Sequence, residues 1–188
     1  MIAIESIKRY HLIDVIIILV FAGIFTALDY LYQHSLNSQL NYILTILTAI
    51  FLLGLVVHLI RKAGSATLFF ILIGLFSWSS TTLGISGTKR LLALLIAGVI
   101  FEVGFLIFKL EAVNMQLDVI ISSSIATASI PLSITLLFSP IIATKNLPGL
   151  LLFSITGLFL GLIATVVSFL AWRYLRKLQL IQRYEQHH

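Results

Sequence analysis

The sequence predicts an all-α integral membrane protein, a bundle of six transmembrane helices with both termini in the cytoplasm. Three observations predict this fold class. Hydrophobic residues make up 60% of the 188 positions and charged residues only 10%, whereas soluble domains average about 25% charged residues. Six apolar segments approach the roughly 20 residues that a membrane-spanning helix needs. The segments between them are short, so we expect one membrane domain over 1–188 and no soluble domain.

The predicted helices follow one another at 12–30, 42–60, 66–83, 91–108, 119–138 and 150–172. The first is too long, and too aromatic at its far end, for a cleaved signal peptide. Lys and Arg residues set the orientation, because cytoplasmic loops carry an excess of them. With both termini inside, the outer side holds only Lys89, Arg90 and Lys145. The inner side holds Lys8, Arg9, Arg61, Lys62, Lys109, Arg173, Arg176, Lys177 and Arg183. The prediction is a multi-pass protein of the cytoplasmic membrane.

The first helix carries a small-x-x-x-small pair, Gly23 and Ala27. Small residues on one face let another helix approach closely, either within the chain or from another protein. The polar residues Asp14, Asp29 and His58 lie near the ends of the first two helices. There they can reach the membrane interface, and we expect no special role for them.

The outer half of the third predicted helix contains FSWSSTTLGIS (76–86), in which Trp78 and Ser79 begin a run of hydroxyl residues. An indole ring in this position can stack on a flat ligand and donate its N–H group. It can equally be an interfacial anchor beside serines that serve packing. The residues support both interpretations.

The fourth helix contains one ionisable side chain, Glu102, in an otherwise apolar run. A carboxylate inside the hydrocarbon costs roughly 2.5 kcal/mol or more on insertion scales, so an intramembrane acid is a functional hypothesis by default. Gly98, one turn toward the outer side, is expected to leave an open space above Glu102, and Phe105 to close it below. We therefore predict that Glu102 forms the base of an outward-facing cavity. The alternative is a structural hydrogen bond to a Ser or Thr hydroxyl of another helix.

The last two helices are rich in small residues. The fifth contains SSSIATASIP (122–131), which favours close packing, and its Pro131 is expected to kink the helix and free a carbonyl. The sixth contains a G-x-x-x-G pair, Gly157 and Gly161. Both patterns recur widely in membrane helices, so they indicate close helix contacts rather than a particular function.

Several classes of function lack support. The chain has no cysteine, hence no disulfide and no thiolate chemistry. There is no H-E-x-x-H or G-x-S-x-G motif, and GISGTK (84–89) lacks the spacing of a phosphate loop. The net charge of +5 is spread over helix ends rather than gathered in a patch, which argues against nucleic acid. We predict no enzyme, no cofactor and no metal site, and leave the tag-like pair His187–His188 out of consideration.

Two stretches carry a resemblance to a known family. HLIRKAGSATLFFILIGLF (58–76) and LLIAGVIFEVGFLIFK (94–109) resemble the substrate-binding S-components of energy-coupling factor (ECF) vitamin transporters, and are most similar to the YkoE-type thiamine or hydroxymethylpyrimidine subfamily. That group has an Arg-Lys/Pro-Gly turn after helix 2 and a helix 4 of the form G-x-x-x-E-x-x-F. The turn reads Arg61, Lys62, Gly64 here, with Ala63 where proline is usual. The helix 4 pattern falls on Gly98, Glu102 and Phe105.

The resemblance implies a high-affinity binding subunit of an ABC-type importer. Such a subunit captures a vitamin or precursor from outside and delivers it through a transmembrane coupling subunit driven by two cytoplasmic ATPases. The small face of helix 1, here Gly23 and Ala27, would meet the coupling subunit. An aminopyrimidine ligand would donate to Glu102 in a charge-assisted contact.

The same resemblance suggests further ligand contacts. Trp78 would stack on the ligand ring, with Ser79 beside it, and Tyr32 and His34 in the first loop would close above as a lid. The main alternative is a different class of protein, a small proton- or ion-coupled transporter or channel with Glu102 as the titrating group. A structural or assembly subunit without a ligand is the third interpretation.

Overall fold

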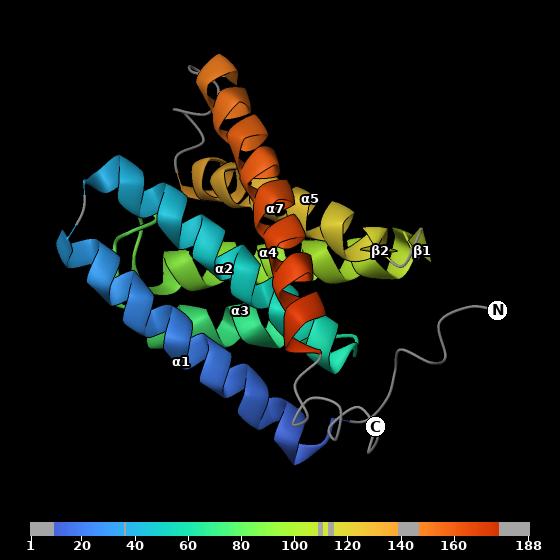
Figure 1. Ribbon diagram of the computed structural model, residues 1–188. Coiled ribbons are helices and arrows are strands. Elements are labelled where there is room, and N and C mark those ends of the chain that lie inside the picture. The colour runs from blue at the N-terminus through green and yellow to red at the C-terminus, as the bar shows by residue number, and fades with distance from the viewer. Residues whose placement is uncertain (1–9, 36, 109–110, 113–114, 139–146, 177–188) are drawn as a thin grey trace.

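The computed structural model of the protein describes residues 10–35, 37–108, 111–112, 115–138 and 147–176. Within these residues the chain forms helices, the turns that join them and one antiparallel pair of two-residue strands, β1 (Glu111–Ala112) with β2 (Met115–Gln116). The helices are α1 (Leu12–Ser35), α2 (Ser38–Ile60), α3 (Ser65–Phe76), α4 (Gly87–Phe108), α5 (Leu117–Phe138) and α7 (Leu147–Leu175) (Figure 1).

Five of these helices, α1, α2, α4, α5 and α7, are long and apolar enough to cross a membrane. The protein is therefore, by length and composition, an all-helical multi-pass membrane protein. The six-span count, the side of the termini and the particular membrane stay predictions. The terminal segments 1–9 and 177–188 lie outside the described residues.

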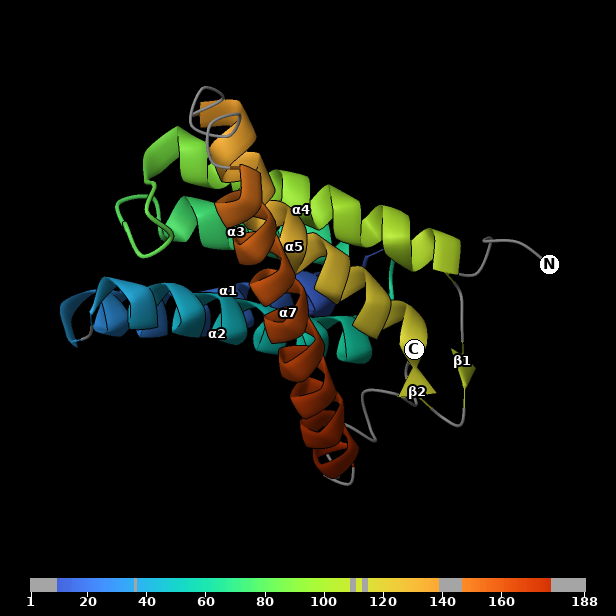
Figure 2. The ribbon, with the colours of Figure 1, turned by 90° about the horizontal axis from the view of Figure 1, so that it is seen from above.

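The helices pack so that the chain has two distinct ends. We call one of them the loop end, at the left of Figure 1. There α1 is followed by α2, and residues 77–86 join α3 to α4. At the other, which we call the turn end, residues 61–64 join α2 to α3. Helix α7 packs on α5 and α2 and crosses α4 steeply in both views (Figures 1 and 2).

The predicted helices 12–30, 42–60, 91–108, 119–138 and 150–172 each fall inside an observed helix. The third differs, because α3 ends at Phe76 and the predicted segment 66–83 is therefore only partly helical. The Ser77 hydroxyl bonds the Ile73 carbonyl, and turns follow up to Gly84, which has a positive φ of 75°. Ser and Thr side chains compete for backbone hydrogen bonds in this way and weaken a helix.

The small residues of α5 and α7 serve packing within the chain. A Cβ on Gly161 would lie 2.6 Å from Thr127 Oγ1, and one on Gly157 would lie 3.1 Å from the Thr127 carbonyl oxygen. That carbonyl is four residues before Pro131, which has no N–H group to pair with it. The glycines of α7 thus fit against α5 beside its proline, and the hydroxyls of Ser123 and Thr165 join the two helices at 2.5 Å.

Candidate functional site

The turn end is held together by side chains from three parts of the chain. Lys62 is buried and donates to the Asp14 carboxylate at 2.6 Å, and the Tyr10 hydroxyl donates to the Ala63 carbonyl at 2.7 Å. Burial, together with the carboxylates of Glu102 and Asp14, raises the pKa of the Tyr10 phenol, so this hydroxyl stays a donor. The backbone reverses through a left-handed Arg61 (φ 50°).

Glu102 belongs to this same turn. Its Oε1 accepts from the backbone N–H of Ala66 at 2.9 Å, and the N–H groups of Gly64 and Thr67 face the same carboxylate. These are the first N–H groups of α3, which have no partner inside their own helix. Glu102 of α4 therefore caps α3 from outside, in the place where a negative charge also meets the positive end of the helix dipole.

The structure places Glu102 differently from the cavity base that the sequence predicts. It lies about 9 Å before the end of α4 at 1.5 Å per residue, at the turn end. The open space expected beside Gly98 is absent, because a Cβ there would lie 2.9 Å from Thr67 Cα and 3.2 Å from the Phe70 ring. Gly98 lets α3 and α4 pack closely, and the ring of Phe105 stacks on Phe101 with centroids 6.1 Å apart.

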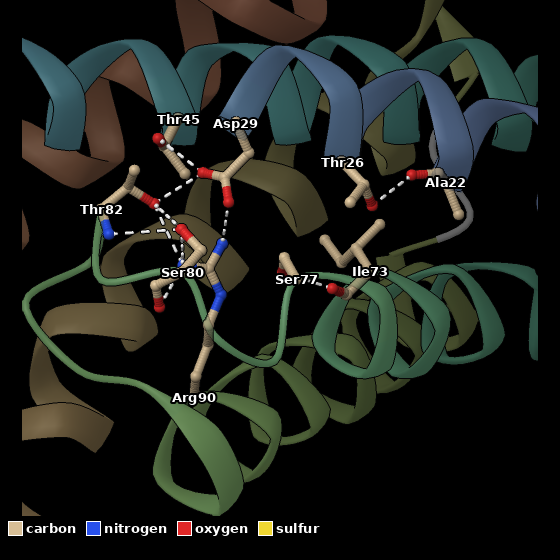
Figure 3. A network of polar contacts seen from close by, with 9 residues as sticks. All are labelled: Ala22, Thr26, Asp29, Thr45, Ile73, Ser77, Ser80, Thr82 and Arg90. Atoms are coloured by element: carbon tan, nitrogen blue, oxygen red, sulfur yellow. Dashed lines mark hydrogen bonds and ion pairs between the residues drawn. The ribbon is translucent and has the colours of Figure 1, made fainter. Parts of the chain in front are cut away.

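A second buried charge pair lies at the loop end (Figure 3). Arg90 Nη2 of α4 donates to Asp29 Oδ2 of α1 at 2.9 Å, and both side chains are at most 1% exposed. Asp29 Oδ1 accepts from Thr45 of α2 at 3.1 Å and from Thr82 at 2.6 Å. Arg90 Nη1 also donates to Thr82 and to the hydroxyl and carbonyl of Ser80. One network thus ties three helices to the 77–86 segment.

The expectation that Asp14, Asp29 and His58 simply reach the interface was wrong. Each is buried. His58 Nδ1 lies 2.6 Å from the Gly54 carbonyl oxygen, and the His58 ring centroid lies 5.8 Å from that of Phe169 and 6.4 Å from that of Trp172. A position near a helix end suggested an interfacial side chain. For the two aspartates the sequence did contain a signal. Helices with almost no charged residues still hold acidic and basic residues, and buried charges are retained mainly as pairs of opposite sign.

A cavity of about 660 Å³ opens at the loop end. Its volume is typical of small-molecule sites, which range over roughly 300–1,000 Å³. Four parts of the chain line it: the end of α1, the start of α2, the 77–86 segment and the first half of α7. The lining residues are Gln33, Gln39, Asn41, Tyr42, Ile43, Thr81, Thr82, Leu83, Gly84, Phe153, Thr156, Phe159 and Leu160.

The predicted ligand residues are divided between the two ends. Trp78 and Ser79 are exposed on the 77–86 segment, and His34 is exposed with its ring 4.5 Å from that of Tyr30. Tyr32 is partly buried, and its hydroxyl lies 3.0 Å from that of Thr48. None of these four residues lines the cavity, and Glu102, Gly98 and Phe105 lie on the α4 segment that leads to the turn end.

The predicted partner face of α1 is uncovered. Gly23 and Ala27 are exposed, and a Cβ on Gly23 would meet nothing within 4 Å. The neighbouring positions Val20 and Ile24 are 54% and 45% exposed. Unlike the glycines of α7, this face therefore has no helix of the described chain packed on it.

Within the described residues no group of three or more His, Cys, Asp or Glu side chains could hold a metal ion. Comparison of the chain with protein-family models, curated proteins and solved structures finds no match.

Proposed function

We propose that the protein is a membrane-embedded receptor for a small molecule, the substrate-binding subunit of an importer of the ECF type. The observation that carries the proposal is the cavity at the loop end, which combines carboxamides and hydroxyls with the rings of Tyr42, Phe153 and Phe159. Ligand sites are usually apolar hollows with a few polar groups that fix orientation. In the predicted orientation the loop end faces outward, where such a receptor meets its ligand.

Two further features support the proposal. The small-residue face of α1 at Gly23 and Ala27 is exposed, as a docking face for a coupling subunit must be before the importer assembles. In addition, the 61–64 turn and the Glu102 pattern, on which the resemblance rests, belong to one structural unit through the bond from Ala66 to Glu102.

The alternative, an ion-coupled transporter with Glu102 as its titrating group, has less support. The Glu102 carboxylate is occupied by backbone N–H groups of α3. The two buried acids of α1 are each bonded to a cation, Asp14 to Lys62 and Asp29 to Arg90. None of these groups lines the cavity at the loop end.

Native mass spectrometry of the protein, purified in mild detergent from membranes, tests the proposal. We expect one small molecule retained per chain without any ion gradient, and co-isolation of a coupling subunit with ATPases when the chain is purified from its own cells. A chain that retains no small molecule, but transports an ion across liposome membranes when reconstituted alone, would contradict the proposal in favour of the alternative.

A further inference from the structure

The described side chains that line the loop-end cavity carry no formal charge. Their polar groups are the carboxamides of Gln33, Gln39 and Asn41 and the hydroxyls of one tyrosine and three threonines. Carboxamides and hydroxyls can both donate and accept hydrogen bonds. The cavity is therefore suited to a ligand that carries both donors and acceptors.

The charges of the Asp29–Arg90 pair behind the cavity wall compensate each other. Thr82 lines the cavity, and its hydroxyl donates to Asp29 and accepts from Arg90 behind it. Both oxygens of the Asp29 carboxylate already have partners, and the Arg90–Asp29 distance is 2.9 Å. A ligand in the cavity therefore meets a neutral pair behind the wall rather than an available carboxylate.

The other described residues offer no carboxylate at this end. The sequence has no acidic residue between Asp29 and Glu102, nor between Asp118 and Glu185. The α1–α2 connection, the 77–86 segment and the whole stretch from α5 into α7 consequently lack one. Glu102 and Asp118 belong to the turn end, at the close of α4 and the start of α5.

A charged ligand would lose its hydration in this cavity without gaining a counter-charge from any of the described lining side chains, which is unfavourable. Aromatic rings can attract a cation by their faces, but the same rings stack equally on an uncharged flat ring. With carboxamides beside the rings and no free carboxylate, the balance favours the uncharged ring.

We infer that the cavity takes an uncharged ligand with a flat, hydrogen-bonding ring, and discriminates against organic cations. The inference rests on the proposed function and narrows its ligand class. Hydroxymethylpyrimidine, which is uncharged, and thiamine, whose thiazolium ring is a permanent cation, serve as probes of this discrimination.

The first test identifies the molecule that the purified protein retains. The protein is denatured, the released compound is identified by mass spectrometry, and binding of hydroxymethylpyrimidine and thiamine is measured in parallel.

An uncharged released compound, with thiamine bound at least about tenfold more weakly than hydroxymethylpyrimidine if either binds, supports the inference. A released organic ion, or thiamine as the tighter of the two, overturns the inference but leaves the proposed receptor function standing. If nothing is released and neither compound binds, the proposed function itself fails, and the inference with it.

The second test places a carboxylate in the cavity by an isosteric change, Gln33→Glu. We expect the ratio of thiamine affinity to hydroxymethylpyrimidine affinity to rise about tenfold. The control is Gln116→Glu at the turn end, where the carboxamide lies beside Arg61, and we expect it to alter neither affinity. If Gln33→Glu leaves the preference between the two compounds unchanged while the variant keeps the wild-type melting temperature, the cavity does not determine ligand charge and the inference is overturned.

Discussion

At the scale of single residues, Glu102 illustrates how a buried carboxylate can serve a helix end. The sequence alone predicts a ligand contact, whereas the observed bond runs to the backbone of α3. We expect Glu102→Gln to lower the free energy of unfolding by about 1 kcal/mol, the usual effect of losing a helix cap or its charge, and to leave ligand affinity unchanged. Melting temperature and dissociation constant, measured on one preparation, check this.

The opposite pattern, unchanged melting temperature with binding weakened more than about tenfold, would return Glu102 to the ligand site. Glu102→Asp is the matched control. It keeps the charge but shortens the reach, so an intermediate loss of stability is expected.

The Asp29–Arg90 pair leads to a second prediction. Removing one partner of a buried pair leaves the other charge uncompensated and costs about 3–5 kcal/mol. We expect Arg90→Gln and Asp29→Asn each to lower stability strongly, and the double variant to be more stable than either. Thermal unfolding of the four proteins in one detergent gives the coupling between the two sites. Additive losses would mean that the two charges stabilise the fold independently, contrary to the 2.9 Å contact.

Sequence reasoning could find Glu102 but could not find its partner. A carboxylate in an apolar helix is visible in any hydropathy profile, whereas the N–H groups that satisfy it belong to the backbone and leave no trace in residue types. Arg90 was missed for another reason. Because Arg90 directly follows Lys89, the sequence suggested that both belong to a polar loop. In the structure α4 begins at Gly87 and Arg90 is completely buried.

At the scale of helices, two small-residue faces with the same sequence pattern have different surroundings. Gly161→Ala would bring a Cβ to 2.6 Å from Thr127 Oγ1 and 2.9 Å from Ser124 Cα, an overpacking that typically costs about 1–3 kcal/mol. Gly23→Ala meets open space, so the higher helix propensity of alanine should leave stability unchanged or slightly raised. Melting temperatures of the two variants check this contrast. Equal losses would show that α1 packs against the chain as α7 does.

The exposed face of α1 has a separate consequence for assembly. We expect Gly23→Leu and Ala27→Leu to keep ligand binding and lose co-purification with a coupling subunit, because a bulky side chain holds the partner helix away. Val167→Ala, a change at a 49% exposed position on α7, is the control. Normal uptake by both leucine variants would exclude this face as the docking site.

The positions of most helices could be predicted because hydropathy alone determines where long apolar helices lie. The third helix could not be placed correctly. From the sequence alone, the hydroxyl residues after Phe76 are interpreted as the polar outer half of the same helix. In the structure Ser77 bonds the Ile73 carbonyl at the end of α3, turns follow, and Ser80 and Thr82 enter the Asp29–Arg90 network. The cavity was also beyond sequence reasoning, because it is formed where four separated segments meet and none of them carries a recognisable motif.

At the scale of the whole molecule, the orientation can be tested on a chain that has no cysteine. Single cysteines at two exposed positions, Ser79→Cys at the loop end and Arg176→Cys after α7, give specific labelling sites. We expect a membrane-impermeant maleimide to label Ser79→Cys on intact cells and Arg176→Cys only after permeabilisation. The reverse pattern would turn the loop-end cavity toward the cytoplasm and contradict the importer proposal.

The most direct test of the central claim, that the loop-end cavity holds a small molecule, is ligand retention by a variant whose cavity is filled. Thr156→Trp places a large ring in the cavity wall, while Ile155→Trp, one residue earlier and 52% exposed, does not line the cavity. Native mass spectrometry counts the retained molecules per chain in both variants and in the wild type. We predict retention by the wild type and Ile155→Trp and none by Thr156→Trp; equal retention by all three would contradict the account.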